Sequence, residues 1–301
     1  MKKFWALSRT THGVLDLANP GFVALLWLGN FPHWSVILLS LFTAFAAYTA
    51  IYALNDLAGI VTDKEKFSGG MNAGYSVEAS DLRYPLAQNI LSFRNGVLWF
   101  AGWFIVALIG AYFLNPAIDI ILITAAILEV IYVSLFKVTY LRTFVSGLVK
   151  SSGPISAIFV VDKSPDVWMV LLIFAWVLFW EIGGQNIPAD WNDTVEDKRV
   201  HAKTIPLHFG TKTAGQIVIA TLLITVVISM FLPLASPLTL GWTYLLASAA
   251  AGAFLLLRPG LQLARLQEGR LAAKLFDNAS YYPMAQLVII TAFVLIGNFL
   301  G

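Results

Sequence analysis

The 301-residue sequence contains no cysteine. Disulfides, thiolate-bound metals, iron–sulfur clusters and a cysteine nucleophile are therefore excluded. Any metal ion has to be bound through oxygen or imidazole ligands. Imidazole is scarce as well, because the chain has four histidines and they form no helical His-Glu-His pattern. Carboxylates are therefore the expected metal ligands.

Charged residues are also rare: they make up 12% of the chain, whereas hydrophobic residues make up 58%. Soluble globular proteins average about 25% charged and about 45–50% apolar residues. A chain with so few charges cannot cover a surface that faces water, so its composition predicts a multi-pass integral membrane protein. The 19 basic and 17 acidic residues nearly balance, and a net charge of +2 provides no basic surface for nucleic acid.

Nine apolar runs are long enough to cross a bilayer, which takes about 20 mostly apolar residues in a helix. The run from Trp34 to Leu54 carries no charge and is hard to explain as a helix of a soluble core. The sequence thus predicts an all-α integral membrane protein with nine transmembrane helices. The predicted spans are 15–31, 34–54, 96–114, 117–136, 143–161, 166–186, 214–233, 239–257 and 280–300.

Basic residues indicate the orientation of these helices. When the loops alternate between two sides, 17 of the 19 Lys and Arg residues fall on the side of the N-terminus; Lys163 falls on the other side and Lys150 inside a span. The positive-inside rule places the basic side in the cytoplasm. The sequence therefore predicts a plasma-membrane protein with a cytoplasmic N-terminus and an outside C-terminus. The polar stretch 8–12 interrupts the apolar residues before it, so we expect the N-terminus to form a short interfacial helix rather than a cleaved signal peptide.

The three long loops, 55–95, 187–213 and 258–279, all lie on the predicted cytoplasmic side. The first opens with Asn55 and Asp56, and Asp63 follows. If the preceding helix continues through this segment, Asp56 and Asp63 lie two turns apart on one face. They are then placed to bind the same ligand.

The second loop carries Asp190, Asp193 and Asp197 at a spacing of i, i+3 and i+7. On a helix this spacing forms one stripe of carboxylates, and cations between them relieve their mutual repulsion. Mg²⁺ is usually bound by one or two carboxylates and by the phosphate oxygens of a substrate. Two acidic clusters on one side, with Lys and Arg nearby, predict a site for Mg²⁺ and a diphosphate. The alternative is that both clusters are solvated helix ends.

These segments resemble the two motifs of the UbiA superfamily of intramembrane aromatic prenyltransferases, which includes 4-hydroxybenzoate polyprenyltransferases. The first family motif, N-D-x-x-D-x-x-x-D at the end of helix 2, is matched by Asn55, Asp56 and Asp63. The second, D-x-x-x-D after helix 6, is matched by Asp193 and Asp197. Weaker similarities are the extra acid at Asp190, the stretch Arg83-Tyr84-Pro85-Leu86, the basic Lys137 between helices 4 and 5, and Lys203-Thr204 followed by Phe209-Gly210.

The resemblance implies one nine-helix domain over residues 1–301, in which the loops 55–95 and 187–213 cap a central cavity open to lipid. It also implies Mg²⁺-dependent transfer of an isoprenyl group from a prenyl diphosphate to an aromatic or other small acceptor, in lipid-quinone or related isoprenoid biosynthesis. No obligate protein partner is expected. The implied catalytic residues are Asp56, Asp63, Asp190, Asp193 and Asp197; the metal ligands are Asn55, Asp56, Asp63, Asp193 and Asp197; the diphosphate ligands are Asn55, Lys137, Arg142 and Lys203.

Gly59 departs from the family pattern, because it stands at the middle Asp of the first motif, which is commonly a Mg²⁺ ligand. Asn55, one turn earlier, or Glu65 is expected to take over part of this role; otherwise activity is reduced or altered. The segment 68–74 is too rich in glycine for a stable helix, and we expect it to form a lid that orders over bound substrate.

The implied reaction also needs a dry pocket with aromatic faces to stabilise a prenyl cation. Three ionisable residues, Glu129, Lys150 and Glu181, fall well inside predicted spans, away from the ends, where a charge is costly unless it is paired or functional. We expect Lys150 and Glu181 to pair and hold two helices together; alternatively, one of these residues deprotonates or orients the acceptor. Candidate pocket aromatics, none of them assigned, are Tyr48, Tyr52, Tyr132, Phe136, Tyr140 and Trp191.

Two other functions stay open. Acidic loops that bind cations at a gate are typical of a transporter or channel, which would conduct ions and release no diphosphate from prenyl diphosphates. A UbiA-like protein that has lost turnover through Gly59 would instead serve as a binding or scaffold protein.

Overall fold

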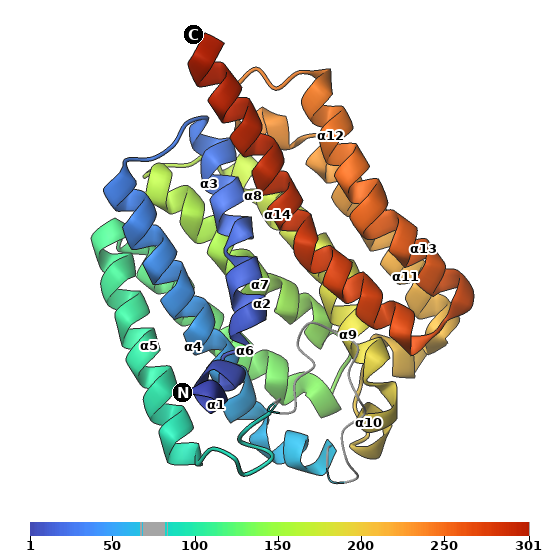
Figure 1. Cartoon of the computed structure of the whole chain (residues 1–301). Coiled ribbons are helices and arrows are strands. Elements are labelled where there is room, and N and C mark those ends of the chain that lie inside the picture. The colour runs from blue at the N-terminus through green and yellow to red at the C-terminus, as the bar shows by residue number, and fades with distance from the viewer. Residues whose placement is uncertain (67, 69–81, 83, 301) are drawn as a thin grey trace.

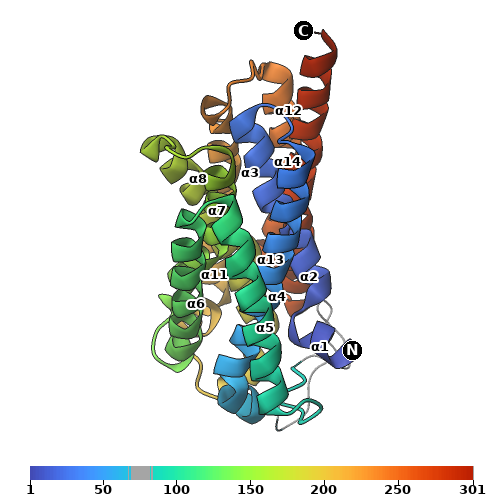
Figure 2. The same ribbon diagram turned by 90° about the vertical axis from the view of Figure 1, so that its left-hand side faces the viewer.

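Every regular element of the described residues is a helix. The computed structural model describes residues 1–66, 68, 82 and 84–300, with side chains up to residue 297. Most of the helices run side by side along the long axis of the molecule (Figures 1 and 2). This arrangement confirms the predicted all-α class.

Eight helical segments of the described chain are long and apolar enough to cross a membrane. They coincide with eight of the nine predicted spans, so this part of the membrane prediction is confirmed. These segments are α4 (Trp34–Lys66), α5 (Phe93–Leu114), α6 (Ala117–Ser134) with η1 (Leu135–Lys137), α7 (Arg142–Val161), α8 (Val167–Trp180) with η2 (Glu181–Asn186) and α9 (Ile187–Asn192), α11 (Ile205–Ser229), α12 (Trp242–Gly252) with η4 (Ala253–Leu257) and α13 (Arg258–Leu266), and α14 (Gly269–Leu300).

The remaining predicted span, 15–31, is divided between α2 (Thr10–Asp16) and α3 (Ala18–Leu28). With 11 residues, α3 is about 16 Å long at about 1.5 Å per residue, which is shorter than a hydrocarbon core of about 30 Å. Leu17, between the two helices, keeps helical dihedral angles of φ −59° and ψ −22°. The α3 helix packs against α7 and α14, and Phe22 within it is fully buried.

The other elements are short. The helix α1 (Lys2–Leu7) is the short N-terminal helix expected from the sequence, α10 (Thr194–Arg199) follows α9, and η3 (Leu232–Ala235) follows α11. The segments η1 and η3 are 3₁₀ helices, whereas η2 and η4 are π-helical turns between α-helices. Such π turns frequently accompany functional sites, and η2 directly precedes the second acidic cluster.

Small residues let neighbouring helices approach closely, as is common in membrane proteins. Between α4 and α5, a Cβ atom added to Gly110 would lie 2.1 Å from Thr43 Oγ1. Around this point Ala46, Ala107 and Ala111 are fully buried. The close packing of α4 fixes the helix that carries the first acidic cluster.

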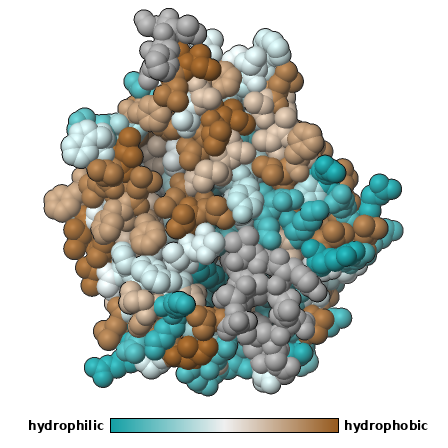
Figure 3. Space-filling view, in the orientation of Figure 1, coloured by the Kyte–Doolittle hydropathy of each residue, from teal (hydrophilic) through white to brown (hydrophobic). Residues whose placement is uncertain are grey.

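The surface is divided into an apolar belt and a polar end (Figure 3). Hydrophilic residues gather at the end of the molecule where α1 and α10 lie, and the C-terminus lies at the opposite end (Figure 1). Large exposed apolar side chains elsewhere are suited to contact with lipid. They include Leu38, Leu98, Phe113, Ile120, Trp168 and Trp242.

Both acidic segments are more helical than the predicted loops 55–95 and 187–213. The helix α4 runs on to Lys66, so the condition for placing Asp56 and Asp63 on one helix is met. In the second segment, α9, α10 and the first turns of α11 replace most of the loop. The expected glycine-rich lid lies outside the described residues, apart from Ser68.

Candidate active site

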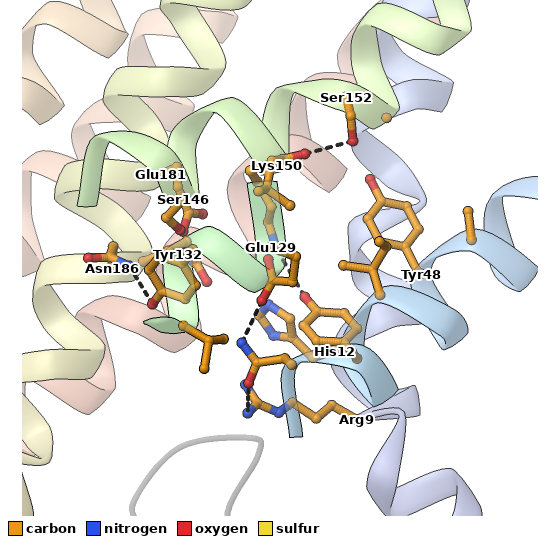
Figure 4. A pocket seen from close by; sticks show the side chains of 18 of the residues that line it. Arg9, His12, Tyr48, Glu129, Tyr132, Ser146, Lys150, Ser152, Glu181 and Asn186 are labelled. Carbon is orange, nitrogen blue, oxygen red and sulfur yellow. Dashed lines mark hydrogen bonds between the residues drawn. The ribbon is translucent and has the colours of Figure 1, made fainter. Parts of the chain in front are cut away.

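The first acidic cluster lies on the continuous helix α4. The side chain of Asp56 is buried, and its Oδ1 accepts a hydrogen bond from Arg9 Nη2 at 3.2 Å. The same guanidinium donates to Asn55 Oδ1 at 3.1 Å, and Asn55 Nδ2 donates to Glu129 Oε1 at 2.5 Å. These bonds link the N-terminal segment, α4 and α6 (Figure 4).

The second acidic cluster is placed by a bend after the π-helical turn η2. The helix α9 carries Asp190 and ends at Asn192, and the φ of −95° and ψ of 13° of the next residue, Asp193, are not helical. The helix α10 carries Asp197, whose backbone N–H donates to Asp193 O at 2.9 Å. The predicted helix is therefore interrupted at Asp193, although the carboxylates of Asp193 and Asp197 both lie beside Lys66.

Basic side chains pair with the carboxylates of this second cluster. Lys66 Nζ lies 2.9 Å from Asp193 Oδ2 and 2.7 Å from Asp197 Oδ1, and Arg142 pairs with Asp190. The side chains of Lys66 and Arg142 are only 8% and 5% exposed. Charges buried this deeply are costly unless they are paired. The last residue of α4 thereby joins the two clusters.

Negative charge is concentrated around Asp197. Burial raises the pKa of its carboxyl to about 7; the nearby charge of Lys66 opposes this shift, whereas Asp190 and Asp193 add to it. The buried oxygens Asp197 Oδ2 and Asp190 Oδ2 accept no hydrogen bond from any residue that the structure describes. These oxygens can therefore still accept a hydrogen bond or bind a cation.

A central cavity of about 290 Å³ connects both clusters with the interior of the bundle. Asp63 lines it from α4, and Asp190 and Asp193 line it from the side of α9. Farther in, Glu129 and Glu181 belong to its wall (Figure 4). Beyond them the lining becomes apolar, with Ala47, Ile118, Leu122, Val149, Ala157 and Val160.

The residues around this cavity fit an ion of the Mg²⁺ type. Carboxylate and amide oxygens are the available ligands, and hard cations prefer oxygen. Within the described chain, no three His, Asp or Glu side chains already converge on one point. Such a cage is not required, because Mg²⁺ usually keeps waters and phosphate oxygens among its ligands. Asp63 and Asp193 are the carboxylates that reach the cavity from the two clusters.

Comparison with known proteins decides the family. The model of the UbiA prenyltransferase family matches residues 18–289. The chain belongs to the UbiA prenyltransferase family. Members of this family are prenyltransferases, so both the predicted resemblance and the predicted enzyme class are confirmed. No curated protein sequence matches the chain.

Solved structures of UbiA homologues share the fold. A homologue from Aeropyrum pernix K1 is 18% identical and has a TM-score of 0.71, with 96% of this chain and 98% of that chain covered. A homologue from Archaeoglobus fulgidus, bound to DMAPP and Mg²⁺, is 14% identical with a TM-score of 0.69 and covers 96% and 99%. A digeranylgeranylglyceryl phosphate synthase is 18% identical with a TM-score of 0.66 and covers 98% and 97%.

The ligands of the A. fulgidus homologue agree with the predicted chemistry of the family. That protein was solved with DMAPP and Mg²⁺, and also with GPP and Mg²⁺. The prediction that UbiA-family enzymes use Mg²⁺ with prenyl diphosphates is thereby confirmed.

The predicted site residues do not all reach the cavity. Asn55, Asp63, Arg142, Asp190 and Asp193 line it. Behind this lining, Asp56 and Asp197 are buried within the two clusters.

Two predicted diphosphate ligands lie farther out. Lys137 Nζ pairs with Glu65 Oε2 at 2.6 Å, and both side chains are substantially exposed. Lys203 is exposed, although its backbone N–H donates to Phe136 O at 2.8 Å and so places it near η1. Their roles in binding diphosphate stay predictions.

Four of the six candidate aromatics line the cavity: Tyr48, Tyr52, Tyr132 and Phe136. The guanidinium of Arg142 lies 4.6 Å from the ring centroid of Tyr132 and 4.5 Å from that of Phe136. The other two have structural surroundings, because Tyr140 stacks on His208 and Trp191 is buried in the core.

The three ionisable residues of the predicted spans have polar partners. Lys150 Nζ pairs with Asp16 Oδ2 at 2.7 Å, and Glu181 Oε1 accepts from Ser146 Oγ at 2.6 Å. Lys150 of α7 thus forms its ion pair with Asp16 of α2. The prediction that Lys150 pairs with Glu181 is therefore wrong.

Sequence reasoning missed Arg9, Asp16 and Lys66 as residues of the site. Asp16 had a usable signal, because it is a charge inside the predicted span 15–31. In the sequence, nothing distinguishes Arg9 and Lys66 from the other basic residues of the predicted cytoplasmic side. Only the packing of α2 and α10 against α4 reveals their carboxylate partners.

Proposed function

We propose that this UbiA-family protein transfers an isoprenyl group from a prenyl diphosphate to a small acceptor within the membrane. One observation carries this proposal: a single cavity joins paired carboxylates and buried cations at the polar end with an apolar chamber between the long helices. A prenyl diphosphate has the same two-part chemistry, a highly charged head on an apolar tail. Family membership and the ligands of the A. fulgidus homologue support the proposal.

The charged part of the cavity suits a diphosphate leaving group. The bond between the allylic carbon and the diphosphate oxygen breaks, and its electron pair leaves with the diphosphate. Lys66 and Arg142 line the cavity, and fixed cations stabilise the charge that grows on this leaving group. Mg²⁺, when bound, would add Lewis-acid stabilisation of the diphosphate. Asp63, Asp190 and Asp193 are the lining carboxylates that would hold the ion.

The inner part of the cavity suits the prenyl cation and the acceptor. Tyr48, Tyr52 and Tyr132 belong to its wall, and aromatic faces stabilise a cation in dry surroundings. The cation forms a bond with the acceptor, which then releases a proton. Glu129 and Glu181 are the carboxyl groups of the wall placed to accept that proton. We propose an aromatic or other small acceptor, in lipid-quinone or related isoprenoid biosynthesis.

We further propose one domain with nine crossings of the plasma membrane, the first formed by α2 and α3 together. The cavity would open to lipid for the prenyl tail, and the N-terminus and the active site would face the cytoplasm. This orientation is supported by the 17 of 19 basic residues on one predicted side. The positions of α1 and the C-terminus at opposite ends of the molecule agree with an odd number of crossings (Figure 1).

Purified protein tests this function when it is mixed with geranylgeranyl diphosphate, Mg²⁺ and a panel of phenolic and lipid acceptors. The expected result is release of diphosphate and a prenylated product, both dependent on Mg²⁺. Tight binding of the diphosphate without product from any acceptor would indicate a binding protein. Ion flux in liposomes without diphosphate release would indicate a transporter.

Asp193→Ala should reduce turnover by at least about 100-fold, because it removes a carboxylate that would hold the Mg²⁺ ion beside the leaving group. The measurement is the rate of diphosphate release, with circular dichroism to show that the variant is folded. Glu268→Ala is the matched control, since Glu268 pairs with Arg270 on the exposed turn between α13 and α14. Wild-type turnover in Asp193→Ala would place the metal elsewhere.

A further inference from the structure

One face of the helical segment formed by η4 and α13 carries apolar and basic side chains in alternation. The exposed residues of this face are Phe254, Arg258, Leu261 and Arg265. Their spacing of four, three and four residues places them on one side of a helix. The other side of α13 packs against α11 and α14. These four residues, called the basic stripe below, therefore form the outer face of the segment.

The arginines of the basic stripe have no partner within the part of the chain that the structure describes. Arg258 and Arg265 form neither an ion pair nor a side-chain hydrogen bond there. Acidic residues are scarce nearby, because residues 205–280 contain five basic and only two acidic residues. One of the two acids, Glu268, already pairs with Arg270 at 2.5 Å. The stripe thus presents two unpaired guanidinium groups.

A third exposed basic residue, Lys212, comes from the neighbouring helix α11. The preceding residue, Thr211, donates a hydrogen bond to Gln267 Oε1 just after the end of α13. One turn later, a Cβ atom added to Gly215 would lie 3.0 Å from Ala264 Cα. Lys212 is therefore at the same end of this helix pair as Arg265. Hydrophilic and apolar residues lie side by side on the surface at the turn between α13 and α14 (Figures 1 and 3).

The basic stripe belongs to the segment Trp242–Leu266, which is long and apolar enough to cross a membrane. Its two arginines are about 10 Å apart along the helix, whereas each headgroup layer of a bilayer is about 5–8 Å thick. With Arg265 at the level of the headgroups, Arg258 lies at the boundary with the hydrocarbon. A charge at this depth is costly unless it is paired. Lipid phosphates are the anions available there, and guanidinium groups bind phosphate with two parallel hydrogen bonds.

We propose that the basic stripe, together with Lys212, binds the phosphate headgroup of an anionic membrane lipid. The three cations attract the headgroup, while Leu261 and Phe254, farther along the stripe, contact the acyl chains. A zwitterionic lipid carries its own cation and gains less from this surface. The inference is independent of the proposed function, because lipid binding involves neither a prenyl diphosphate nor turnover.

Lipid binding to detergent-purified full-length protein tests the proposal. Native mass spectrometry gives the dissociation constants of dioleoyl phosphatidylglycerol and dioleoyl phosphatidylcholine. We expect the wild type to bind phosphatidylglycerol at least about tenfold more tightly. Arg258→Gln combined with Arg265→Gln should abolish this preference, because each basic side chain near an anionic headgroup strengthens binding about fivefold. Lysine at both positions keeps the charge and should keep the preference.

The matched control is Lys64→Gln combined with Arg94→Gln, which removes two charges from exposed positions on α4 and α5. It should bind phosphatidylglycerol as the wild type does. Equal affinities of the wild type for the two lipids would overturn the proposal, and so would an unchanged preference in the double glutamine variant of the stripe. Complete displacement of phosphatidylglycerol by inorganic phosphate would also contradict it, because the surface would then be a site for free anions. The comparison of the two lipids on the wild type decides the matter even if a variant does not fold.

Discussion

Glu181 places a carboxyl group deep in the wall of the cavity. The residue is 6% exposed, and its Oε1 accepts from Ser146 at 2.6 Å. The buried Oε2 accepts no hydrogen bond from the described residues, and the same is true of Asn186 Oδ1. A buried acceptor without a donor is costly. This part of the wall therefore suits an acceptor substrate that brings hydroxyl or N–H donors.

Glu181→Gln should raise KM for a hydroxyl-bearing acceptor about tenfold, the effect of losing roughly 1.4 kcal/mol of charge-assisted hydrogen bonding. KM for the prenyl diphosphate should stay unchanged, because the two acidic clusters are untouched. Steady-state kinetics in which each substrate is varied in turn separates these effects. An equal rise in both KM values would contradict a role at the acceptor.

Among the helices, α4 contributes most to the position of the candidate site. Its extension past the predicted span carries the first acidic cluster and brings Lys66 to α10. Its position depends on close packing against α5, where Gly110 faces Thr43. The two helices can approach this closely only because residue 110 has no side chain, and this approach fixes the position of α4.

Gly110→Ala should destabilise the protein by about 1–3 kcal/mol, because the added methyl group overpacks the α4–α5 crossing. Gly102→Ala, on the same helix, is the control, since a Cβ there meets no atom within 4 Å. Thermal unfolding in detergent compares the two variants. Thr43→Ala combined with Gly110→Ala should recover part of the loss. Equal midpoints for Gly102→Ala and Gly110→Ala would show that the crossing tolerates a larger side chain.

For the whole molecule, the separation of a polar end from an apolar belt predicts a fixed orientation in the membrane (Figure 3). Three long segments lie between Lys163 and Arg270, namely those beginning with α8, α11 and α12. An odd number of crossings would place these two exposed residues on opposite sides of the bilayer.

The absence of native cysteine makes single-cysteine labelling a direct test of this topology. In intact cells, a membrane-impermeant maleimide should label Lys163→Cys, whereas Arg270→Cys should react only after the membrane is opened. Both positions are exposed in the structure. The reverse pattern would mean that the active site faces outward, and labelling of both in intact cells would exclude three crossings between them.

Local composition was enough to predict the all-α class, eight of the helices and the segments that carry the acidic motifs. The length of an apolar run and the number of charges in it depend only on residues that are neighbours in the sequence. The helices and the acidic segments can therefore be predicted from the sequence. The predicted span ended at residue 54, and only the structure shows that α4 continues through Asp56 and Asp63. The interruption of the helix at Asp193 was not predicted, because the spacing of three aspartates is equally compatible with a continuous helix.

The partners of the aspartates could not be predicted from the chain, because they come from distant segments. Lys66 and Asp193 are 127 residues apart, and Arg9 and Asp56 are 47 apart. Their contacts arise only when α2, α9 and α10 pack around α4, and burial then makes it costly to leave either partner of a pair without the other. The sequence by itself thus determined the helices and the segments that carry the aspartates. Only the packing of the helices decided which cationic side chains pair with those aspartates, because the partners come from distant parts of the chain.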